Sequence, residues 1–431
     1  MRTRKLMAAM VIAAAATTGL PAHAAAGQSM DVIVQLDPAV ADPAALAEVH
    51  LNRHGGTLRG VYRHALKGFA ATLSPSAVTA LRAHPLVKSI EPDGPMSISG
   101  EAMPWGSWPA FDNPQPQAQS VPTGIRRVFA DDNPNLKING QPDYVPDVDI
   151  VIFDTGIDFD HPDLNVAGRV DCTSGTCQEN TGDDRHGHGS HVAGTAAAVD
   201  NGTGVVGIAP GARLTALKVL GDNGSGQWSW FVAAVDWVRA RAATYEVANA
   251  SLGGTGAPSA LETAINNLVD AGVPLTVAAG NNKADARNHQ PAAYASVITV
   301  SALADFNGDP GGGAASTCRA DQDDTLADFS NFGAGIEITA PGVCIHSTFK
   351  DGGYNQTFSG TSMAAPHVAG ATALYASVRK PANRADVFAI RDYLRSTGNL
   401  NWTDDSPDGV KEPLLDLGDA TKWPPAPAGS R

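Results

Sequence analysis

The sequence predicts an α/β protein with a mostly parallel sheet and helices on both faces, preceded by a small α+β unit of ferredoxin-like order. Apolar, strand-like runs alternate with helical stretches over most of the chain. The N-terminal part instead follows the order β-α-β-β-α-β. Of the 431 residues, 43% are hydrophobic and 17% are charged, which is enough apolar material for more than one buried core.

The small N-terminal unit covers residues 31–93. Gly55-Gly56 ends its first helix and Ser74-Pro75 begins its second, in keeping with the residues preferred at helix ends. This order of elements predicts that both helices lie on one face of the sheet. The expected strands are 31–36, 58–63, 67–73 and 86–91, and the expected helices are 43–54 and 74–83.

The larger unit follows a segment at 94–122 that is rich in Pro, Gly, Ser and Gln, and this segment is predicted to be a cleavable linker. A parallel sheet of this kind carries its functional residues at the carboxyl ends of its strands. The expected strands are 148–153, 212–220, 247–252, 274–279 and 297–302. The expected helices are 190–199, 228–241, 259–271 and 362–379.

Residues 1–24 have the pattern of a secretory signal peptide. Basic residues precede the apolar run 6–16, which is too short to span a bilayer, and Ala22-His23-Ala24 is typical of a cleavage site. A membrane anchor is the alternative. The formal charge of −14 argues against nucleic acid or an anionic membrane as the main partner. We therefore expect a secreted, extracellular monomer with neither nucleic-acid nor membrane partners.

The chain has four cysteines. An even number in an exported chain suggests two disulfides, for which three pairings exist. Local pairing, Cys172 with Cys177 and Cys318 with Cys344, is favoured. A structural zinc site is the weaker alternative because no C-x-x-C spacing occurs.

Three segments carry the residues of nucleophilic acyl transfer, which needs a hydroxyl, a base that takes its proton and a carboxylate that orients the base. The segment 149–158, DIVIFDTGID, is a buried strand that ends in Asp154. The segment 186–195, HGHGSHVAGT, places histidines at a helix start. The segment 358–370, FSGTSMAAPHVAG, places a serine at another helix start, where its amide N–H can also face an oxyanion.

In order and in residues, these segments resemble the catalytic blocks of the subtilisin-like serine proteases (subtilases). The resemblance implies a triad of Asp154, His188 and Ser362. The segment VAAGN resembles the family's oxyanion strand and nominates Asn281 as a donor to the tetrahedral intermediate. The segment NASLGG resembles the edge strand that pairs with substrate. The implied substrate-binding residues are Ser251, Leu252, Gly253, Ala278 and Gly280.

The resemblance also implies how the chain is organised and what it does. It implies a serine endopeptidase that hydrolyses peptide bonds in proteins through an acyl-enzyme, with broad specificity and a preference for apolar side chains. Residues 31–93 resemble the family's inhibitory propeptides, so the enzyme is expected as a self-processing zymogen. The expected parts are a signal peptide at 1–24, a propeptide at 25–96, a linker at 97–117 and a catalytic domain at 118–431.

A structural calcium site is implied as well. Ala118–Gly124 resembles the mature N-terminus of the family, and Asp163 together with the loop 199–205 resembles its strong calcium site. Hard oxygen ligands from loops suit calcium, while the alternative is a polar turn without a metal. The implied ligands are side-chain oxygens of Gln119, Asp163 and Asn201 and carbonyls of Val199, Thr203 and Val205.

Other interpretations remain open at this point. His186, His188 and His191 have a spacing that can ligate zinc. The segment FDTG resembles an aspartic protease elbow, although no second such segment occurs. A protease fold that binds peptides without cleaving them, and an N-terminal unit that is merely a stable domain, are further alternatives. The segment 303–326 has no counterpart in the family pattern, and its acidic run 321–324 is expected to be solvated, as is Asp183-Asp184.

Overall fold

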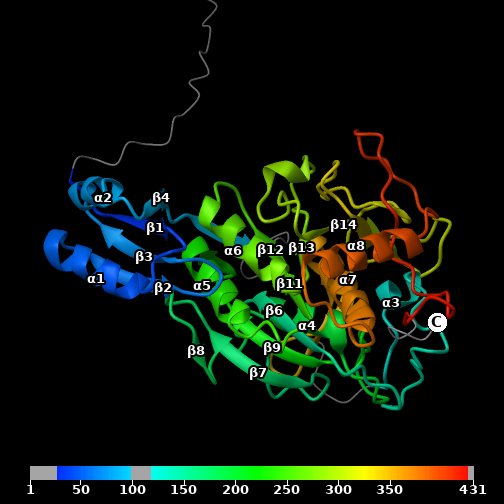
Figure 1. Cartoon of the computed structure of the whole chain (residues 1–431). Coiled ribbons are helices and arrows are strands. Elements are labelled where there is room, and N and C mark those ends of the chain that lie inside the picture. The colour runs from blue at the N-terminus through cyan, green and yellow to red at the C-terminus, as the bar shows by residue number, and fades with distance from the viewer. Residues whose placement is uncertain (1–26, 99–117, 426–431) are drawn as a thin grey trace, which may run out of the picture.

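The structure, a computed structural model, describes residues 27–98 and 118–425 (Figure 1). The expected signal peptide at 1–24 therefore lies outside the described residues, as does most of the predicted linker. Within the described ranges, no helix combines the length and the apolar character needed to cross a bilayer.

The N-terminal unit has the predicted β-α-β-β-α-β order. Its four strands form an antiparallel sheet in the order β2-β3-β1-β4. The side chains of Asp42 and Ser74 accept hydrogen bonds from backbone amides in the first turns of α1 and α2, which explains where these helices begin. The elements are β1 Met30–Leu36, α1 Pro43–His54, β2 Thr57–Tyr62, β3 Gly68–Leu73, α2 Pro75–Arg82 and β4 Val87–Pro92.

A nine-stranded sheet forms the centre of the larger unit, in the order β15-β14-β13-β11-β6-β9-β7-β8, with β16 paired to β14. The pairs are parallel except those of the outer strands β8 and β15. The strands are β6 Asp149–Asp154, β7 Val166–Asp171, β8 Gln178–Glu179, β9 Arg213–Lys218, β11 Val247–Ala250, β13 Leu275–Ala278, β14 Ile298–Ala304, β15 Thr325–Leu326 and β16 Ile338–Pro341.

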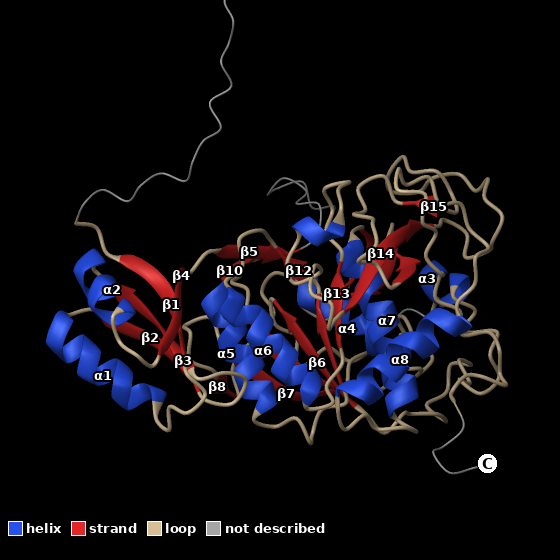
Figure 2. Ribbon diagram, turned by 45° about the horizontal axis from the view of Figure 1, so that its top comes forward, coloured by secondary structure: helices blue, strands red, loops and turns tan. Residues whose placement is uncertain are grey.

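Helices cover both faces of this sheet, which confirms the predicted fold class (Figures 1 and 2). The helices α4 (His188–Ala197) and α7 (Thr361–Ala376) share one apolar core with the sheet. The helices α5 (Trp228–Arg239) and α6 (Ser259–Asp270) share another core on the opposite face. Strands buried on both sides account for the continuous apolar runs in the sequence.

The helix α8 (Arg384–Thr397) was not predicted. Its buried side chains Val387, Ile390 and Leu394 follow helical spacing, and Asn383 caps its first turn. These two local signals were present in the sequence. The short remaining elements are α3 Thr123–Arg127, the 3₁₀ turn Ala286–Asn288, β17 Ile345–Thr348 and β18 Tyr354–Phe358.

A three-stranded antiparallel sheet joins the two units. Its middle strand, β5 (Pro95–Ile98), lies between β10 (Ser225–Gln227) and β12 (Leu252–Gly253) (Figure 2). Residues 97 and 98, where the linker was predicted to begin, pair with the larger unit. Met96 in β5 is buried in the same apolar cluster as Trp228.

The buried carboxyl group of Glu412 is expected to make the stability of the fold depend on pH. Burial raises the pKa of this carboxyl from 4.5 to about 8, so between these values the folded state holds a proton that the unfolded state releases. The free energy of unfolding therefore falls as the pH rises through that window. Glu412→Gln should raise Tm at about pH 9 and leave it nearly unchanged at about pH 4, as scanning calorimetry would show. An equal change in Tm at both pH values would contradict the expected effect of Glu412 ionisation.

Candidate active site

Three elements bring the predicted triad residues to one edge of the sheet. Asp154 ends β6, His188 begins α4, and Ser362 is the second residue of α7. The Nδ1 atom of His188 lies 2.7 Å from Oδ1 of Asp154, and both side chains are buried. The Ser362 hydroxyl donates to the carbonyl of Ser251 at 3.0 Å. Nε2 of His188 makes no hydrogen bond to a described residue.

Asp184 fixes the start of α4. Its carboxylate accepts from the backbone amides of His186, Gly187 and Ser190 at 2.8–2.9 Å and from the hydroxyl of Thr155 at 2.9 Å. The expectation that this aspartate is solvated is wrong, since it is only 4% exposed. Through it, the chain just after Asp154 is tied to the helix that carries the imidazole. Sequence reasoning missed this residue, although an aspartate two to six residues before the amides at a helix start is a local capping signal.

Asn281, which follows β13, is held with its amide nitrogen available. Its Oδ1 accepts from the amide and the hydroxyl of Thr361, both at 2.9 Å. Its Nδ2 is buried and has no hydrogen-bond partner among the described residues. A fixed amide donor beside the nucleophile is the arrangement that stabilises a developing oxyanion.

The residues expected to bind substrate line the edge at which β5 pairs. Leu252 pairs with Ile98 and Gly253 with Ser97, while Ser251 lies at the turn between β11 and β12. An extended segment of this chain therefore already occupies the edge through backbone pairing.

A histidine that was not predicted lies between two of the expected substrate-binding residues, Gly253 and Gly280. A Cβ atom added to Gly253 would lie 2.3 Å from Nε2 of His289, and one added to Gly280 would lie 3.0 Å from the same ring. Ala278 is fully buried beside them, and burial lowers the pKa of His289. The carboxylate of Asp285 accepts from Nε of Arg287 at 3.0 Å.

The six expected calcium ligands are brought together. The carboxylate of Asp163 accepts from Nδ2 of Asn201 at 3.0 Å and from the amide of Val205 at 2.9 Å. Oε1 of Gln119 accepts from the amide of Asn201 at 2.9 Å. Thr203 donates to Oδ1 of Asn201 at 2.7 Å, and the amide of Val199 donates to the Asp163 carbonyl at 3.0 Å. Burial raises the pKa of Asp163 to about 6, although the hydrogen bonds from Val205 and Asn201 lower it.

Both favoured disulfides, Cys172–Cys177 and Cys318–Cys344, are present. The histidines of the zinc alternative face different partners. His191 bonds to the carbonyl of Ile345 at 2.9 Å, and burial lowers its pKa to about 3. The described ranges bring no three His, Cys, Asp or Glu side chains together in a metal-binding arrangement.

The subtilase family model matches residues 146–412. The chain belongs to the subtilase family. A second model, peptidase inhibitor I9, matches residues 31–99, which identifies the N-terminal unit of this subtilase as a propeptide domain. The protein is therefore a serine endopeptidase with an inhibitor domain at its N-terminus.

Known relatives of this subtilase agree with that assignment. Subtilisin NAT of Bacillus subtilis subsp. natto is 36% identical over 350 residues, covering 80% of this chain and 79% of that protein. The alkaline protease of Alkalihalobacillus alcalophilus is 37% identical over 325 residues, covering 75% and 72%. A cold adapted subtilisin-like serine proteinase superposes with a TM-score of 0.54 at 32% identity, covering 68% of this chain and 97% of that chain.

A second solved structure supports the fold alone. Fervidolysin from Fervidobacterium pennivorans, a keratinolytic enzyme related to subtilisin, superposes with a TM-score of 0.67 at 23% identity. The match covers 91% of this chain and 61% of that chain. Because it extends over most of this chain, the match includes residues outside the catalytic unit.

Proposed function

We propose that this subtilase is secreted and cleaves peptide bonds through an acyl-enzyme, with Asp154, His188 and Ser362 as its triad. The hydrogen bond between His188 and Asp154 carries this proposal, since it fixes the imidazole with Nε2 directed away from the carboxylate. Ser362 Oγ attacks the scissile carbonyl while His188 takes its proton. His188 then gives that proton to the leaving amine, and water releases the acyl group by the same steps in reverse.

Asn281 is assigned as a hydrogen-bond donor to the oxyanion of the tetrahedral intermediate. Asn281→Ala is expected to lower kcat about 10²–10³-fold with little change in KM, because its donor acts on charge that forms only in the transition state. Steady-state kinetics on a peptide amide would measure this. A rise in KM at unchanged kcat would contradict the assignment.

The N-terminal unit is assigned as an inhibitor that occupies the cleft. Asp236 in α5 accepts hydrogen bonds from the backbone amides of Arg63, His64 and Ala65 at 2.6–3.0 Å. Glu91 and Asp93, at the end of the unit, accept from the amides that begin α6 and α5. Carboxylates at helix N-termini are favourable, so these contacts hold β5 at the substrate edge.

The proposed parts are a signal peptide at 1–24, a propeptide that extends from 25 past the expected end at 96 to at least Ile98, a linker to 117 and a catalytic domain at 118–431.

The register of β5 supports a first cut close after Ile98. Ile98 pairs with Leu252, and the carbonyl of the preceding Ser251 is hydrogen-bonded to Ser362. The bond between Ser99 and Gly100 is the expected site.

Intact mass and N-terminal sequencing of the secreted protein test this proposal. The wild type should lose the residues up to about 99, whereas Ser362→Ala should remain a full-length precursor after signal removal. A fluorophosphonate probe should label Ser362 in the processed wild type. Processing of both forms in a protease-free host would contradict self-cleavage, and a folded, processed protein that resists labelling would instead be a peptide-binding protein.

Calcium binding by the loop 199–205 is part of the proposal. The buried Asp163 carboxylate and the surrounding amide and carbonyl oxygens fit a hard cation, which would be held by the six residues named above. A bound calcium ion would compensate the negative charge of this carboxylate. It would bind the folded state only.

A chelator is expected to lower the Tm of the mature enzyme, which is kept from digesting itself by an active-site inhibitor. Calcium at a hundredfold excess over Kd contributes about 3 kcal/mol to the free energy of unfolding. Asp163→Asn should remove most of the response to added calcium in scanning calorimetry. An identical Tm of the wild type in chelator and in calcium would contradict the site.

A further inference from the structure

A cavity of about 740 Å³ is lined by His188 and by residues far from it in the sequence. Ile98 at the end of β5, Phe358 near the nucleophile and Arg126 in α3 all contribute to it. Figure 2 shows α3 on the other side of α4 from β5. Since β5 occupies the acyl side of the cleft between β10 and β12, the rest of this cavity is available to the leaving-group side of a substrate.

The segment 303–326 forms one wall of the cavity, to which it contributes Phe306, Thr317 and Cys318. The disulfide from Cys318 to Cys344 fixes this wall beside the catalytic loop. The backbone amide of Cys344 also donates to Ser359, three residues before the nucleophile, at 2.9 Å. The segment that has no counterpart in the family pattern is thus attached directly to the active site.

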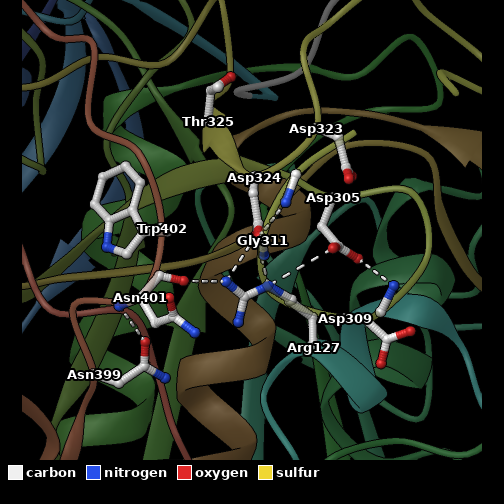
Figure 3. Close-up of polar contacts among 12 residues, drawn as sticks. Arg127, Asp305, Asp309, Gly311, Asp323, Asp324, Thr325, Asn399, Asn401 and Trp402 are labelled. Atoms are coloured by element: carbon white, nitrogen blue, oxygen red, sulfur yellow. Dashed lines mark hydrogen bonds and ion pairs between the residues drawn. The ribbon is translucent and has the colours of Figure 1, made fainter. Parts of the chain in front are cut away.

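A buried arginine holds the same segment from inside (Figure 3). Arg127 donates through Nε to Asp324 at 2.8 Å and through its terminal nitrogen to the carbonyl of Asn401 at 2.7 Å. Asp305 lies 3.7 Å from the same guanidinium. The carboxylate of Asp323 accepts from two backbone amides of the segment at 2.9 Å. These contacts make the wall rigid.

Arg126 supplies the positive charge of the cavity. Its side chain is exposed and packs on Gly308, where an added Cβ would lie 2.8 Å from Cβ of Arg126. Arg126 forms no salt bridge with a described residue, and its charge opposes the rise in the pKa of Asp131 that burial causes. The other charged groups of the lining are engaged, since Arg319 pairs with two aspartates and Asp305 faces Arg127.

We propose that Arg126, positioned by the segment 303–326, selects substrates with an acidic side chain on the leaving-group side of the scissile bond. This inference rests on the proposed endopeptidase function. The chain's own first substrate has this character, because residues 99–117 contain Glu101 and Asp112 and no lysine or arginine. Opposite charges across a partly desolvated rim contribute mainly to association rate and specificity.

Peptides that differ only after the scissile bond test this proposal. The mature enzyme is given a fluorogenic series with one acyl sequence and a single Asp, Ala or Lys scanned over the first four leaving-side positions. At one position or more, kcat/KM should be about threefold or more higher for Asp than for Lys, and the difference should shrink as salt is raised. Equal values at all four positions would overturn the proposal.

Variants of Arg126 show whether this residue is the cause. Arg126→Ala should abolish the Asp preference and Arg126→Glu should reverse it. Arg239→Ala, a change on the distant α5, serves as the control and should keep the preference. A preference that persists in Arg126→Glu would overturn the assignment.

A substrate with no leaving-side peptide separates this inference from the proposed function. Hydrolysis of a peptide p-nitroanilide should be the same in wild type, Arg126→Ala and Arg126→Glu, because the leaving group does not reach Arg126. Failure of the processed wild type on this substrate would contradict the endopeptidase function itself. Normal hydrolysis without any leaving-side preference would contradict only the role of Arg126.

Discussion

Asp154→Ala and Asp154→Asn are both expected to lower kcat about 10⁴-fold. Oδ1 of Asp154 accepts both from Nδ1 of His188 and from the amide of Thr155, each at 2.7 Å. An asparagine keeps the shape of this side chain, but its neutral amide can donate to Nδ1 and so favours the wrong tautomer of the imidazole. It also lacks the negative charge that stabilises the imidazolium.

Alanine removes the charge and the orientation together and leaves the amide of Thr155 without its acceptor. The two variants therefore show whether the charged carboxylate or merely a side chain of this shape is needed. Both should be matured with wild-type enzyme in trans, and kcat should be measured per labelled active site. Asp149→Asn, at the other end of β6, is the matched control and should leave kcat unchanged. An asparagine variant that keeps most of the wild-type kcat would contradict the role of the charge.

The sequence was sufficient for the features that depend on local pattern. The alternation of strands and helices predicted the fold class, whereas Asp154 and His188 were assigned through the resemblance of their segments to the subtilase blocks. Met96 shows the limit of local pattern. The composition around it predicted a linker, but pairing with two strands more than a hundred residues away makes it part of a sheet.

Features that depend on contacts distant in sequence were missed or misread. His289 has no local signal, since its neighbours Gly253 and Gly280 come from other elements. Asp184 differs, because three of the amides that it accepts from lie within six residues of it. The acidic run 321–324 was expected to be solvated, and this is wrong, because Asp321, Asp323 and Asp324 are at most 8% exposed. Carboxylates can be buried where cations and backbone amides compensate them, and composition does not show such partners.

Arg127→Met is expected to destabilise the catalytic domain by about 3–5 kcal/mol. The side chain is fully buried, and its guanidinium joins α3 to Asp305 and Asp324 of the segment 303–326. Methionine fills a similar volume, so the cost arises from the two carboxylates that lose their counter-ion. For a domain of this size, the change corresponds to a fall of about 10 °C in Tm.

Scanning calorimetry of the inhibitor-blocked mature enzyme would measure this fall. Arg213→Met is the matched control: its side chain is 40% exposed and also pairs with two aspartates. Exposed pairs contribute about 0–1 kcal/mol, so its Tm should change by a few degrees at most. A comparable fall in Tm in both variants would mean that the buried ion pairs contribute no more to stability than the exposed ones.

The combination of Arg127→Met with Asp305→Asn and Asp324→Asn identifies the source of the loss. If unpaired buried charge causes it, neutralising both carboxylates should restore part of the stability, and the triple variant should unfold at a higher temperature than Arg127→Met alone. If the lost hydrogen bonds to Asp324 and to the Asn401 carbonyl are the cause, the triple variant should be no more stable. The first outcome is expected, because Asp305 lies at ion-pair distance from Arg127 and its Oδ2 makes no hydrogen bond within the described residues.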